Sequence, residues 1–337
     1  GKLWLERFEQ TKTERRKELH EKLSHLRPRK DGPIILMVTN YGYSWLFLNW
    51  VCSIDNAKLS FLRQRTLIVV TDERAKAIAE KAGFLTYYPH WLGNELLSKI
   101  DPNFPDRFAL GAHKYTVALQ ISQLTDLIAM GHDVILQDTD IIWKRDPLSY
   151  LMQLEFRAID IQMGVDGRND DRGPGNSGFI MIRSNCRTKI FMNTMQNMVP
   201  MVLFGRSDQI VWNTLLREYH FRMISFTTLT TRLFISGFQI NLKLPKEQVL
   251  RSIPDSEKWF LFHASWTTDG FDKIDKFHLI DEFHFTSQRC PQYFDRQLLP
   301  DLKIRQWYIR DKQKDQEKRL TELGFVRDTS NGIYNRG

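Results

Sequence analysis

The chain has 337 residues, of which 42% are hydrophobic and 26% are charged, a composition typical of one large globular domain or two ordinary ones. The net charge is +8, but residues 31–302 hold 29 basic and 30 acidic side chains, so the basic excess lies at the two ends. This distribution excludes a general nucleic-acid-binding groove, and no apolar run reaches the roughly 18 residues that span a membrane.

After residue 30 the chain alternates apolar strands with helices. We predict a strand over residues 34–38, a helix over 44–57 and a strand over 67–70, after which Thr71-Asp72-Glu73 opens a second helix that runs to Ala82. Thr71 is the predicted N-cap of the second helix, and Gly83 ends it. This alternation predicts a mostly parallel sheet with helices on both faces.

A long helix over about residues 109–130 follows, because apolar residues from Val117 to Ile128 recur at helical spacing. The same spacing places Lys114 on the inward side, where it either extends its charged end to solvent or faces an anionic group. Further strands are predicted over residues 134–136, 159–163, 179–182 and 259–262, with a polar, glycine-rich loop over residues 166–178.

Two carboxylates follow the predicted strand over residues 134–136, in the sequence Asp138-Thr139-Asp140. Side chains just beyond the carboxyl end of a parallel strand lie at the edge where open α/β sheets bind ligands. Buried carboxylates this close carry a large desolvation cost unless a cation lies between them. A solvated turn also explains a bare Asp-x-Asp, but the apolar Ile141 and Ile142 that follow favour a divalent metal that bridges phosphate oxygens.

His263 follows a predicted apolar strand, just as the two carboxylates do, and we predict that it completes the metal site. Two carboxylates, one imidazole and two diphosphate oxygens suit an octahedral ion. Both Mg²⁺ and Mn²⁺ accept the carboxylates, and the imidazole favours Mn²⁺. Four segments are therefore predicted to meet at one edge of the sheet, namely residues 39–41, 138–140, 176–178 and His263.

The order of four motifs resembles nucleotide-diphospho-sugar transferases with the GT-A fold, and is closest to glycosyltransferase family 77. That family includes plant arabinosyl- and xylosyltransferases and protist galactosyltransferases. The resemblance implies a Rossmann-like α/β/α sandwich with a mostly parallel central sheet over residues 31–300. The motifs are the strand before Asp-x-Asp, Gly-Asn-Ser-Gly-Phe (175–179), Ser-Asp-Gln-x-x-x-Asn (207–213) and the strand before His-Ala-Ser-Trp (263–266).

The resemblance implies a role for each matching residue. Asp138, Asp140 and His263 bind the metal, with Asp140 as the more direct ligand. Asp208 and Gln209 are the catalytic candidates: Asp208 hydrogen-bonds sugar hydroxyls, and Gln209 lies beside the anomeric carbon on the face opposite the leaving group. Residues 39–41 hold the nucleoside, and Lys273 reaches the β-phosphate. The full predicted donor-binding set is Thr39, Asn40, Tyr41, Lys114, Asp138, Thr139, Asn176, Ser177, Gly178 and Lys273.

The activity implied by the resemblance is metal-dependent transfer of galactose, xylose or arabinose from a UDP-sugar to a hydroxyl of a glycan or glycoprotein. Retention of configuration is implied, either by front-face attack, which we favour, or through a covalent intermediate. One alternative is a metal phosphohydrolase of the haloacid-dehalogenase type, which also places Asp-x-Asp after a strand, although early in its domain. The other is a non-catalytic sugar-binding or scaffold domain.

The ends of the chain differ from its middle. Residues 1–30 mix acidic and basic side chains, which is typical of a solvated, stem-like helical segment, and residues 301–337 are expected to form a peripheral helical tail. The chain begins with Gly1, which favours a type II protein of the Golgi lumen with its anchor upstream. The lack of N-glycosylation sequons and the few cysteines, which lack zinc-site spacing, fit the alternative of a cytoplasmic protein.

Overall fold

The computed structural model of the chain forms two compact units, residues 1–285 and residues 286–337. In the second unit, β11 (Phe325–Arg327) and β12 (Tyr334–Arg336) pair antiparallel, and the rest of the expected helical tail over residues 301–337 lies outside the described residues. The described residues are 1–26, 32–100, 111, 113–167, 174–218, 223–254, 258–267, 270–293, 325–327 and 334–336.

A seven-stranded sheet forms the centre of the first unit, in the order β3-β2-β1-β4-β7-β6-β8. All neighbouring pairs are parallel except those of β7, which runs antiparallel to both β4 and β6. The mostly parallel sheet predicted from the strand–helix alternation is confirmed. Its strands are β1 (Ile34–Thr39), β2 (Thr66–Val70), β3 (Leu85–Tyr87), β4 (Val134–Gln137), β6 (Ile161–Val165), β7 (Gly175–Ile182) and β8 (Phe226–Thr228).

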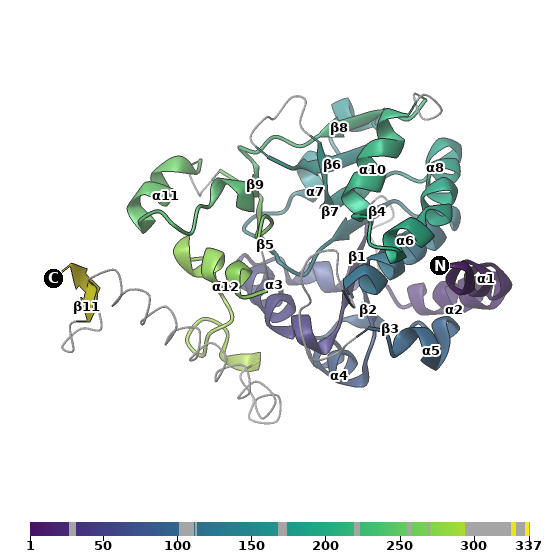
Figure 1. Cartoon of the computed structure of the whole chain (residues 1–337), viewed down its shortest axis with the longest axis horizontal. Coiled ribbons are helices and arrows are strands. Elements are labelled where there is room, and N and C mark those ends of the chain that lie inside the picture. Colours follow the sequence, from purple (N-terminus) through teal and green to yellow (C-terminus); the bar gives the residue numbers. More distant parts are fainter. Residues whose placement is uncertain are drawn as a thin grey trace. The chain divides into compact units, whose positions relative to one another are not determined.

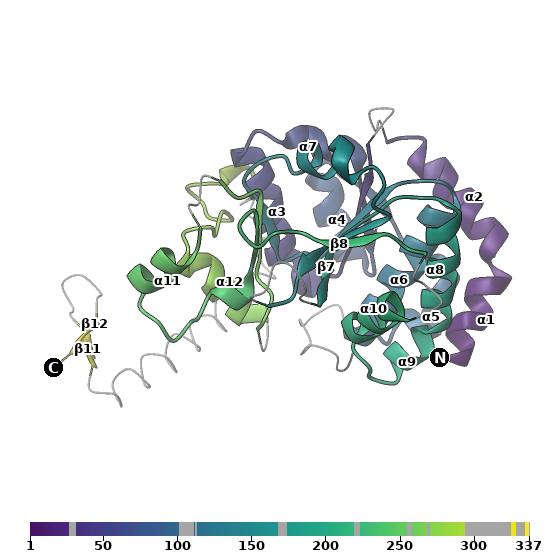
Figure 2. The same ribbon diagram turned by 90° about the horizontal axis from the view of Figure 1, so that it is seen from above.

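Helices cover both faces of this sheet (Figures 1 and 2), which confirms the predicted α/β class. On one side lie α3 (Ser44–Asn56) and α4 (Glu73–Lys81), which match the predicted helices to within one residue. On the other side lie α6 (His113–Ala129), α8 (Cys186–Asn197), α9 (Val199–Leu203) and α10 (Asp208–Arg217). Every residue of β1 is buried, because each face of the strand packs against a helical layer.

The remaining elements of the first unit are shorter or lie at its margins. A second sheet has the order β5-β10-β9 and consists of β5 (Ile141–Trp143), β9 (Phe234–Ser236) and β10 (Leu261–His263). The other helices are α1 (Lys2–Gln10), α2 (Lys12–Leu23), α5 (Gly93–Leu97), α7 (Leu148–Leu151), α11 (Lys246–Ser252) and α12 (Gly270–Leu279), with a 3-10 helix η6 (Gly237–Gln239) among the short turns. No helix in the described part of the chain is long and apolar enough to cross a membrane.

Two local predictions are wrong in detail. The N-cap of α4 is Asp72 rather than Thr71, and its side chain accepts a hydrogen bond from the amide N–H of Ala75 over 2.9 Å. A carboxylate caps better here because its second oxygen accepts the amide N–H of Tyr41 over 2.8 Å, which joins the ends of β1 and β2. Residues 175–178, predicted as loop, begin β7, because their backbone pairs with β6 beyond a register shift between Met163 and Gly164.

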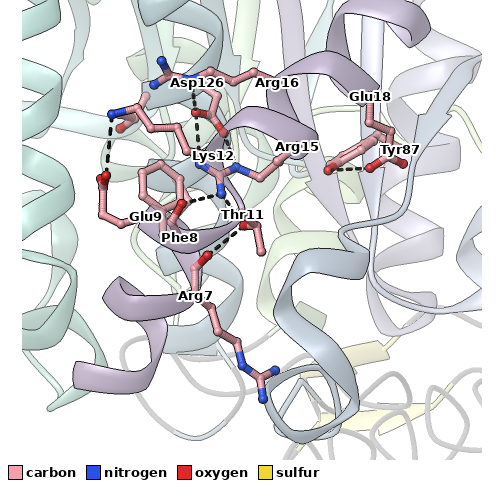
Figure 3. Close-up of polar contacts among 12 residues, drawn as sticks. Arg7, Phe8, Glu9, Thr11, Lys12, Arg15, Arg16, Glu18, Tyr87 and Asp126 are labelled. Atoms are coloured by element: carbon pink, nitrogen blue, oxygen red, sulfur yellow. Dashed lines mark hydrogen bonds and ion pairs between the residues drawn. The ribbon is translucent and has the colours of Figure 1, made fainter.

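The N-terminal helices are packed against the sheet domain rather than solvated along their length (Figure 3). Trp4 and Leu19 are fully buried in the core that includes α6. Arg15 is also buried, and its guanidinium forms an ion pair with Asp126 of α6 and lies 3.8 Å from the centre of the Phe8 ring. The mixed charges of residues 1–30 had indicated a solvated stem, but one of them, Arg15, is buried and pairs with Asp126.

Asp160, just before β6, is the basis of a prediction about pH. It accepts hydrogen bonds from Arg187 Nε (2.9 Å), Asn185 Nδ2 (2.6 Å) and Ser225 N (2.9 Å). Burial alone disfavours its charge, but the bonds from Arg187, Ser225 and Asn185 outweigh burial and lower the pKa of Asp160. A depressed carboxyl pKa stabilises the fold above the unfolded value of about 3.9, and this contribution is lost as pH falls through the folded pKa.

We expect Asp160→Asn to lower the free energy of unfolding by about 1–3 kcal/mol at pH 7. The deficit relative to the unmodified protein should shrink steadily as the pH falls below about 4, because both proteins then carry a neutral side chain at position 160. Urea unfolding monitored by circular dichroism at a series of pH values measures this difference. A deficit that stays constant down to the acid transition would contradict the assignment of the stabilisation to the ionised carboxylate.

Candidate active site

Strand pairing brings the two predicted carboxylates and the predicted histidine together. Asp138 and Asp140 lie in the turn between β4 and β5, and His263 is the last residue of β10. Because β10 pairs antiparallel with β5, His263 lies opposite Ile141. The amide N–H of Ala264 also donates to the carbonyl oxygen of Asp140 over 2.9 Å, so the backbone itself fixes His263 beside Asp140.

The three side chains form a cluster whose donor atoms suit a hard divalent ion. One ligand atom from each of Asp138, Asp140 and His263 lies within 4.8 Å of the other two. His263 Nε2 is 3.3 Å from Asp140 Oδ1 and 3.9 Å from Asp138 Oδ2. Among the described residues, none donates a hydrogen bond of regular geometry to the buried oxygens of Asp140. Carboxylate oxygens and an imidazole nitrogen fit Mn²⁺ or Mg²⁺, with the imidazole favouring Mn²⁺.

Gly178 of β7 allows the sheet to pass directly beside this cluster. A Cβ atom at position 178 would overlap the ring of His263 and lie 2.7 Å from Asp138 Oδ2. The carbonyl oxygen of Gly178 accepts a hydrogen bond from the amide N–H of Asp138 over 2.8 Å. A larger side chain at position 178 would therefore displace two of the three candidate ligands.

Charge in the cluster is unevenly shared between the two carboxylates. Burial, together with the neighbouring charge of Asp140, raises the pKa of Asp138. Burial also opposes ionisation of Asp140, but Lys273 and His263 outweigh it and hold the pKa of Asp140 well below its usual range. Lys273 Nζ lies 2.7 Å from Asp140 Oδ2, and this carboxylate raises the pKa of Lys273 despite its burial. The site therefore contains the positively charged ammonium group of Lys273 as well as two carboxyl groups.

The cluster forms part of the wall of a cavity of about 540 Å³, a size that accommodates a small-molecule ligand. Gln120 of α6 contributes to this wall and donates from Nε2 to Asp138 Oδ1 over 3.0 Å. The lining residues are Val38, Tyr43, His113, Thr116, Val117, Gln120, Asp138, Thr139, Asp140, Asp166, Asn176, Ser177, Gly178, Asp208, Gln209, His263, Ser265, Trp266, Thr267, Asp272 and Lys273.

Asp166 connects several of the predicted sugar-binding residues. Its carboxylate accepts hydrogen bonds from Gln209 Nε2 (2.6 Å), Asn176 Nδ2 (3.1 Å) and Trp266 Nε1 (2.7 Å). Gln209 Oε1 in turn accepts the amide N–H of Ser177 over 3.3 Å. A carboxylate only accepts hydrogen bonds, so Asp166 fixes which end of the Gln209 amide is the donor.

Asp208 lies at the first position of α10 and is buried in the cavity wall. Burial raises the pKa of Asp208 to about 6, and the negative charge of Asp138 adds to this effect, although a hydrogen bond with Ser177 opposes it. At neutral pH Asp208 is thus an ionised acceptor with a proton affinity well above that of a solvated carboxylate. Such a group binds hydroxyl donors strongly.

The structure places most, but not all, of the predicted site residues on this cavity. Thr139, Asn176, Ser177, Gly178, Asp208, Gln209 and Lys273 line it together with the three candidate metal ligands. Thr39, Asn40, Tyr41 and Lys114 do not. The ring of Tyr41 lies 4.0 Å from the guanidinium of Arg74, and the side chain of Asn40 accepts the amide N–H of Tyr43 over 3.0 Å. Tyr41 was predicted to line the donor site, but Tyr43 lines the cavity instead.

Eleven of the lining residues were not assigned to the site by sequence reasoning, and four of these are Gln120, Asp166, Trp266 and Tyr43. Gln120 had a readable signal, because a polar side chain on the buried side of an apolar helix needs a partner. Asp166 had none, since an acid in a polar segment is common in surface turns, whereas Trp266 ends the His-Ala-Ser-Trp motif of the resemblance but was given no role. Their significance depends on a contact between residues a hundred positions apart.

A family model for nucleotide-diphospho-sugar transferases matches residues 62–277, which is more than half of the chain. The chain belongs to the nucleotide-diphospho-sugar transferase family. The matched region contains every candidate metal ligand, the Asp208–Gln209 pair and Lys273. The family-level resemblance read from the four sequence motifs is thereby confirmed, whereas the narrower assignment to glycosyltransferase family 77 stays a prediction.

Two proteins of Arabidopsis thaliana are similar to part of the chain. An uncharacterized protein is 34% identical over 119 residues, which is 34% of each chain. A UDP-D-xylose:L-fucose alpha-1,3-D-xylosyltransferase is 24% identical over 126 residues, 36% of this chain and 31% of the relative. The similarity thus spans about a third of these relatives. Among solved structures, the glycosyltransferase GlyE of Streptococcus pneumoniae aligns with a TM-score of 0.47 and 12% identity over 79% of this chain and 64% of its own.

Proposed function

We propose that this protein is a metal-dependent glycosyltransferase that moves a sugar from a UDP-sugar to a hydroxyl acceptor on a glycan or glycoprotein. The observation that carries the proposal is the cluster of Asp138, Asp140 and His263 on the wall of a ligand-sized cavity, in a chain of the nucleotide-diphospho-sugar transferase family. Two carboxylates and an imidazole are the ligands expected for Mn²⁺, or for Mg²⁺. When bound there, the ion would supply Lewis-acid stabilisation of charge on the diphosphate.

Besides the metal ligands, four residues of the cavity wall are proposed to bind the donor. Lys273, which pairs with Asp140 over 2.7 Å, is within reach of any diphosphate held at the cluster and would contribute a second positive charge. Asp208 would accept hydrogen bonds from hydroxyls of the donor sugar, because it is a buried, ionised acceptor on the cavity wall. Asn176 and Ser177 line the same cavity and would contact the same sugar.

Gln209 is the proposed catalytic group beside the anomeric carbon. Its amide is held at both ends, by Asp166 Oδ2 over 2.6 Å and by the amide N–H of Ser177 over 3.3 Å. A dipole fixed in this way needs little reorganisation when positive charge develops on the sugar ring. We favour retention by front-face attack, with the leaving phosphate accepting the proton of the acceptor hydroxyl. Galactose, xylose and arabinose are the proposed sugars, and a Golgi location stays a prediction.

The two alternatives fit the site less well. A haloacid-dehalogenase-type phosphohydrolase would have its Asp-x-Asp early in the domain, whereas Asp138 and Asp140 follow β4 in the middle of the chain. A non-catalytic binding domain would not require two carboxylates and a histidine within metal-ligand distance of one another on a cavity wall. Family membership also favours transfer from a nucleotide sugar over both alternatives.

A donor screen tests the proposal directly. The protein would be mixed with UDP-galactose, UDP-xylose, UDP-glucose or UDP-arabinofuranose in Mn²⁺, and release of UDP would be measured with and without EDTA. We expect UDP release from at least one donor, its loss on chelation, and its recovery when Mn²⁺ is restored. Calorimetry supplies the control, because UDP should bind with Mn²⁺ present and not in EDTA. Binding of inorganic phosphate without UDP would instead favour the phosphohydrolase, and binding of neither would favour the scaffold.

A further inference from the structure

Trp266 is an exposed aromatic side chain on the wall of the same cavity. It is 56% exposed, while Asp140, Asp208 and His263 on that wall are buried. Among the described residues, Trp266 is the one large hydrophobic side chain that is both exposed and part of the cavity wall. Asp140 and His263 of the metal cluster therefore lie at the buried part of the cavity, and Trp266 lies where the cavity meets solvent.

The indole of Trp266 is held in place at its edge and by a neighbouring ring. Its Nε1 donates to Asp166 Oδ1 over 2.7 Å, and its ring centre lies 4.9 Å from that of Phe238 with the planes at 77°. An edge-to-face pair of this kind fixes the orientation of a ring while it leaves a face of the ring uncovered. The exposed area of Trp266 is thus a preformed surface rather than a mobile side chain.

The backbone of Trp266 is also constrained, because its φ of 58° is one that bulky residues rarely adopt. Lys276, which is 3% exposed, stabilises this conformation by donating from Nζ to the carbonyl oxygens of Gly237 (2.7 Å), Ser265 (2.8 Å) and Trp266 (2.8 Å). An unfavourable backbone conformation that the surrounding structure maintains is characteristic of functional sites. The residue held in this conformation lines the cavity.

The groups around Trp266 combine an apolar face with hydrogen-bonding side chains. Asp166 contacts Trp266, Gln209 and Asn176, and Gln209 is the residue that we place beside the anomeric carbon. A saccharide ring offers one face of C–H groups, which packs on an aromatic ring, and hydroxyls at its edge, which carboxylates and amides bind. The donor diphosphate belongs at the buried metal cluster, so an acceptor has to approach the anomeric carbon from the solvent side.

We propose that Trp266 is the binding platform for a saccharide acceptor, whose ring stacks on the indole and whose hydroxyls bind Asp166. This inference rests on the proposed transferase function and specifies the chemical class of its acceptor. It excludes a protein hydroxyl as the primary acceptor. Lys276 is a positioning residue in this arrangement, because it acts on the acceptor only through the backbone of Trp266, whereas Asp166 would contact the acceptor itself.

The test compares Trp266→Ala and Trp266→Phe with the unmodified protein in Mn²⁺ and a UDP-sugar that the protein hydrolyses. The acceptor probes are methyl β-D-galactopyranoside, methyl β-D-xylopyranoside, methyl α-L-arabinofuranoside and methyl α-L-fucopyranoside. At least one should accelerate UDP release, and Trp266→Ala should raise its KM by about tenfold or more. Trp266→Phe, which keeps an aromatic face but loses the Nε1 donor, should have an intermediate KM. Hydrolysis of the donor in the absence of acceptor is measured for each variant as well, because Trp266 bonds Asp166, which holds Gln209, and the fold-rise in acceptor KM should exceed the fold-change in this hydrolysis.

Phe204→Ala is the matched control, because Phe204 is 94% exposed and lies outside the cavity wall. It should leave both acceptor KM and donor hydrolysis unchanged. Saturation-transfer NMR with the same glycosides adds a readout that needs no turnover: ring C–H signals should be strong with the unmodified protein and lost with Trp266→Ala. The inference is overturned if no glycoside binds or if Trp266→Ala changes the donor KM alone. Absence of donor hydrolysis in the unmodified protein would instead reject the transferase function itself.

Discussion

Replacement of Asp140 by alanine is expected to lower metal-dependent UDP release by on the order of 10³-fold. Asp140 is 1% exposed and lies within metal-ligand distance of both Asp138 and His263. A bound metal ion contributes several kcal/mol of charge stabilisation in the transition state, and each 1.4 kcal/mol or so corresponds to a tenfold change in rate. Loss of this ligand should therefore affect kcat far more than it affects the stability of the fold.

Two measurements separate loss of the metal from damage to the protein. Mn²⁺ should raise the unfolding temperature of the unmodified protein and leave that of Asp140→Ala unchanged, because an ion that binds the folded state stabilises it by mass action. Glu73→Gln is the matched control: it also removes a carboxylate charge, but Glu73 has a side chain that is 74% exposed and lies outside the cavity wall. Full activity of Asp140→Ala in Mn²⁺ would reject the assigned metal site.

The second large effect concerns stability. Asp126→Ala is expected to lower the free energy of unfolding by about 3–5 kcal/mol, because it leaves the guanidinium of Arg15 buried without its carboxylate partner. The side chains of Arg15 and Asp126 are both fully buried, and Arg15 donates from Nε and Nη2 to the two oxygens of Asp126. Arg15 also donates to the carbonyl oxygen of Phe8 over 2.6 Å, which satisfies only part of its hydrogen-bonding capacity.

Two further variants distinguish an unpaired charge from a simple loss of contacts. Arg16→Ala removes the other partner of Asp126, but Arg16 is 26% exposed, so we expect a loss of about 1 kcal/mol or less. The double variant Arg15→Met with Asp126→Leu removes both buried charges and should be more stable than Asp126→Ala alone. Urea unfolding followed by circular dichroism measures all three. A loss below about 1 kcal/mol for Asp126→Ala would show that solvent reaches Arg15 after all.

The sequence alone predicted five of the seven strands of the central sheet, because their signals are local, whereas the three-residue strands β3 and β8 were not predicted. Runs such as Ile34–Val38 and Val134–Leu136 are apolar throughout and are bounded by polar or glycine residues, so they are buried strands wherever they pair. The position of Asp138 and Asp140 at the end of β4 followed from the same pattern. The end of α4 at Gly83, which has a φ of +82°, was likewise predicted from the local sequence.

The tertiary structure decided everything that depends on pairing between distant segments. The three-residue strand β10 has no periodicity of its own, and only its register with β5 places His263 beside Asp140. The bonds from Gln209 and Trp266 to Asp166 and the ion pair of Arg15 with Asp126 join segments separated by 43, 100 and 111 positions, respectively. Local propensity carries no information about such contacts, because they are selected by the packing of the whole core rather than by neighbouring residues.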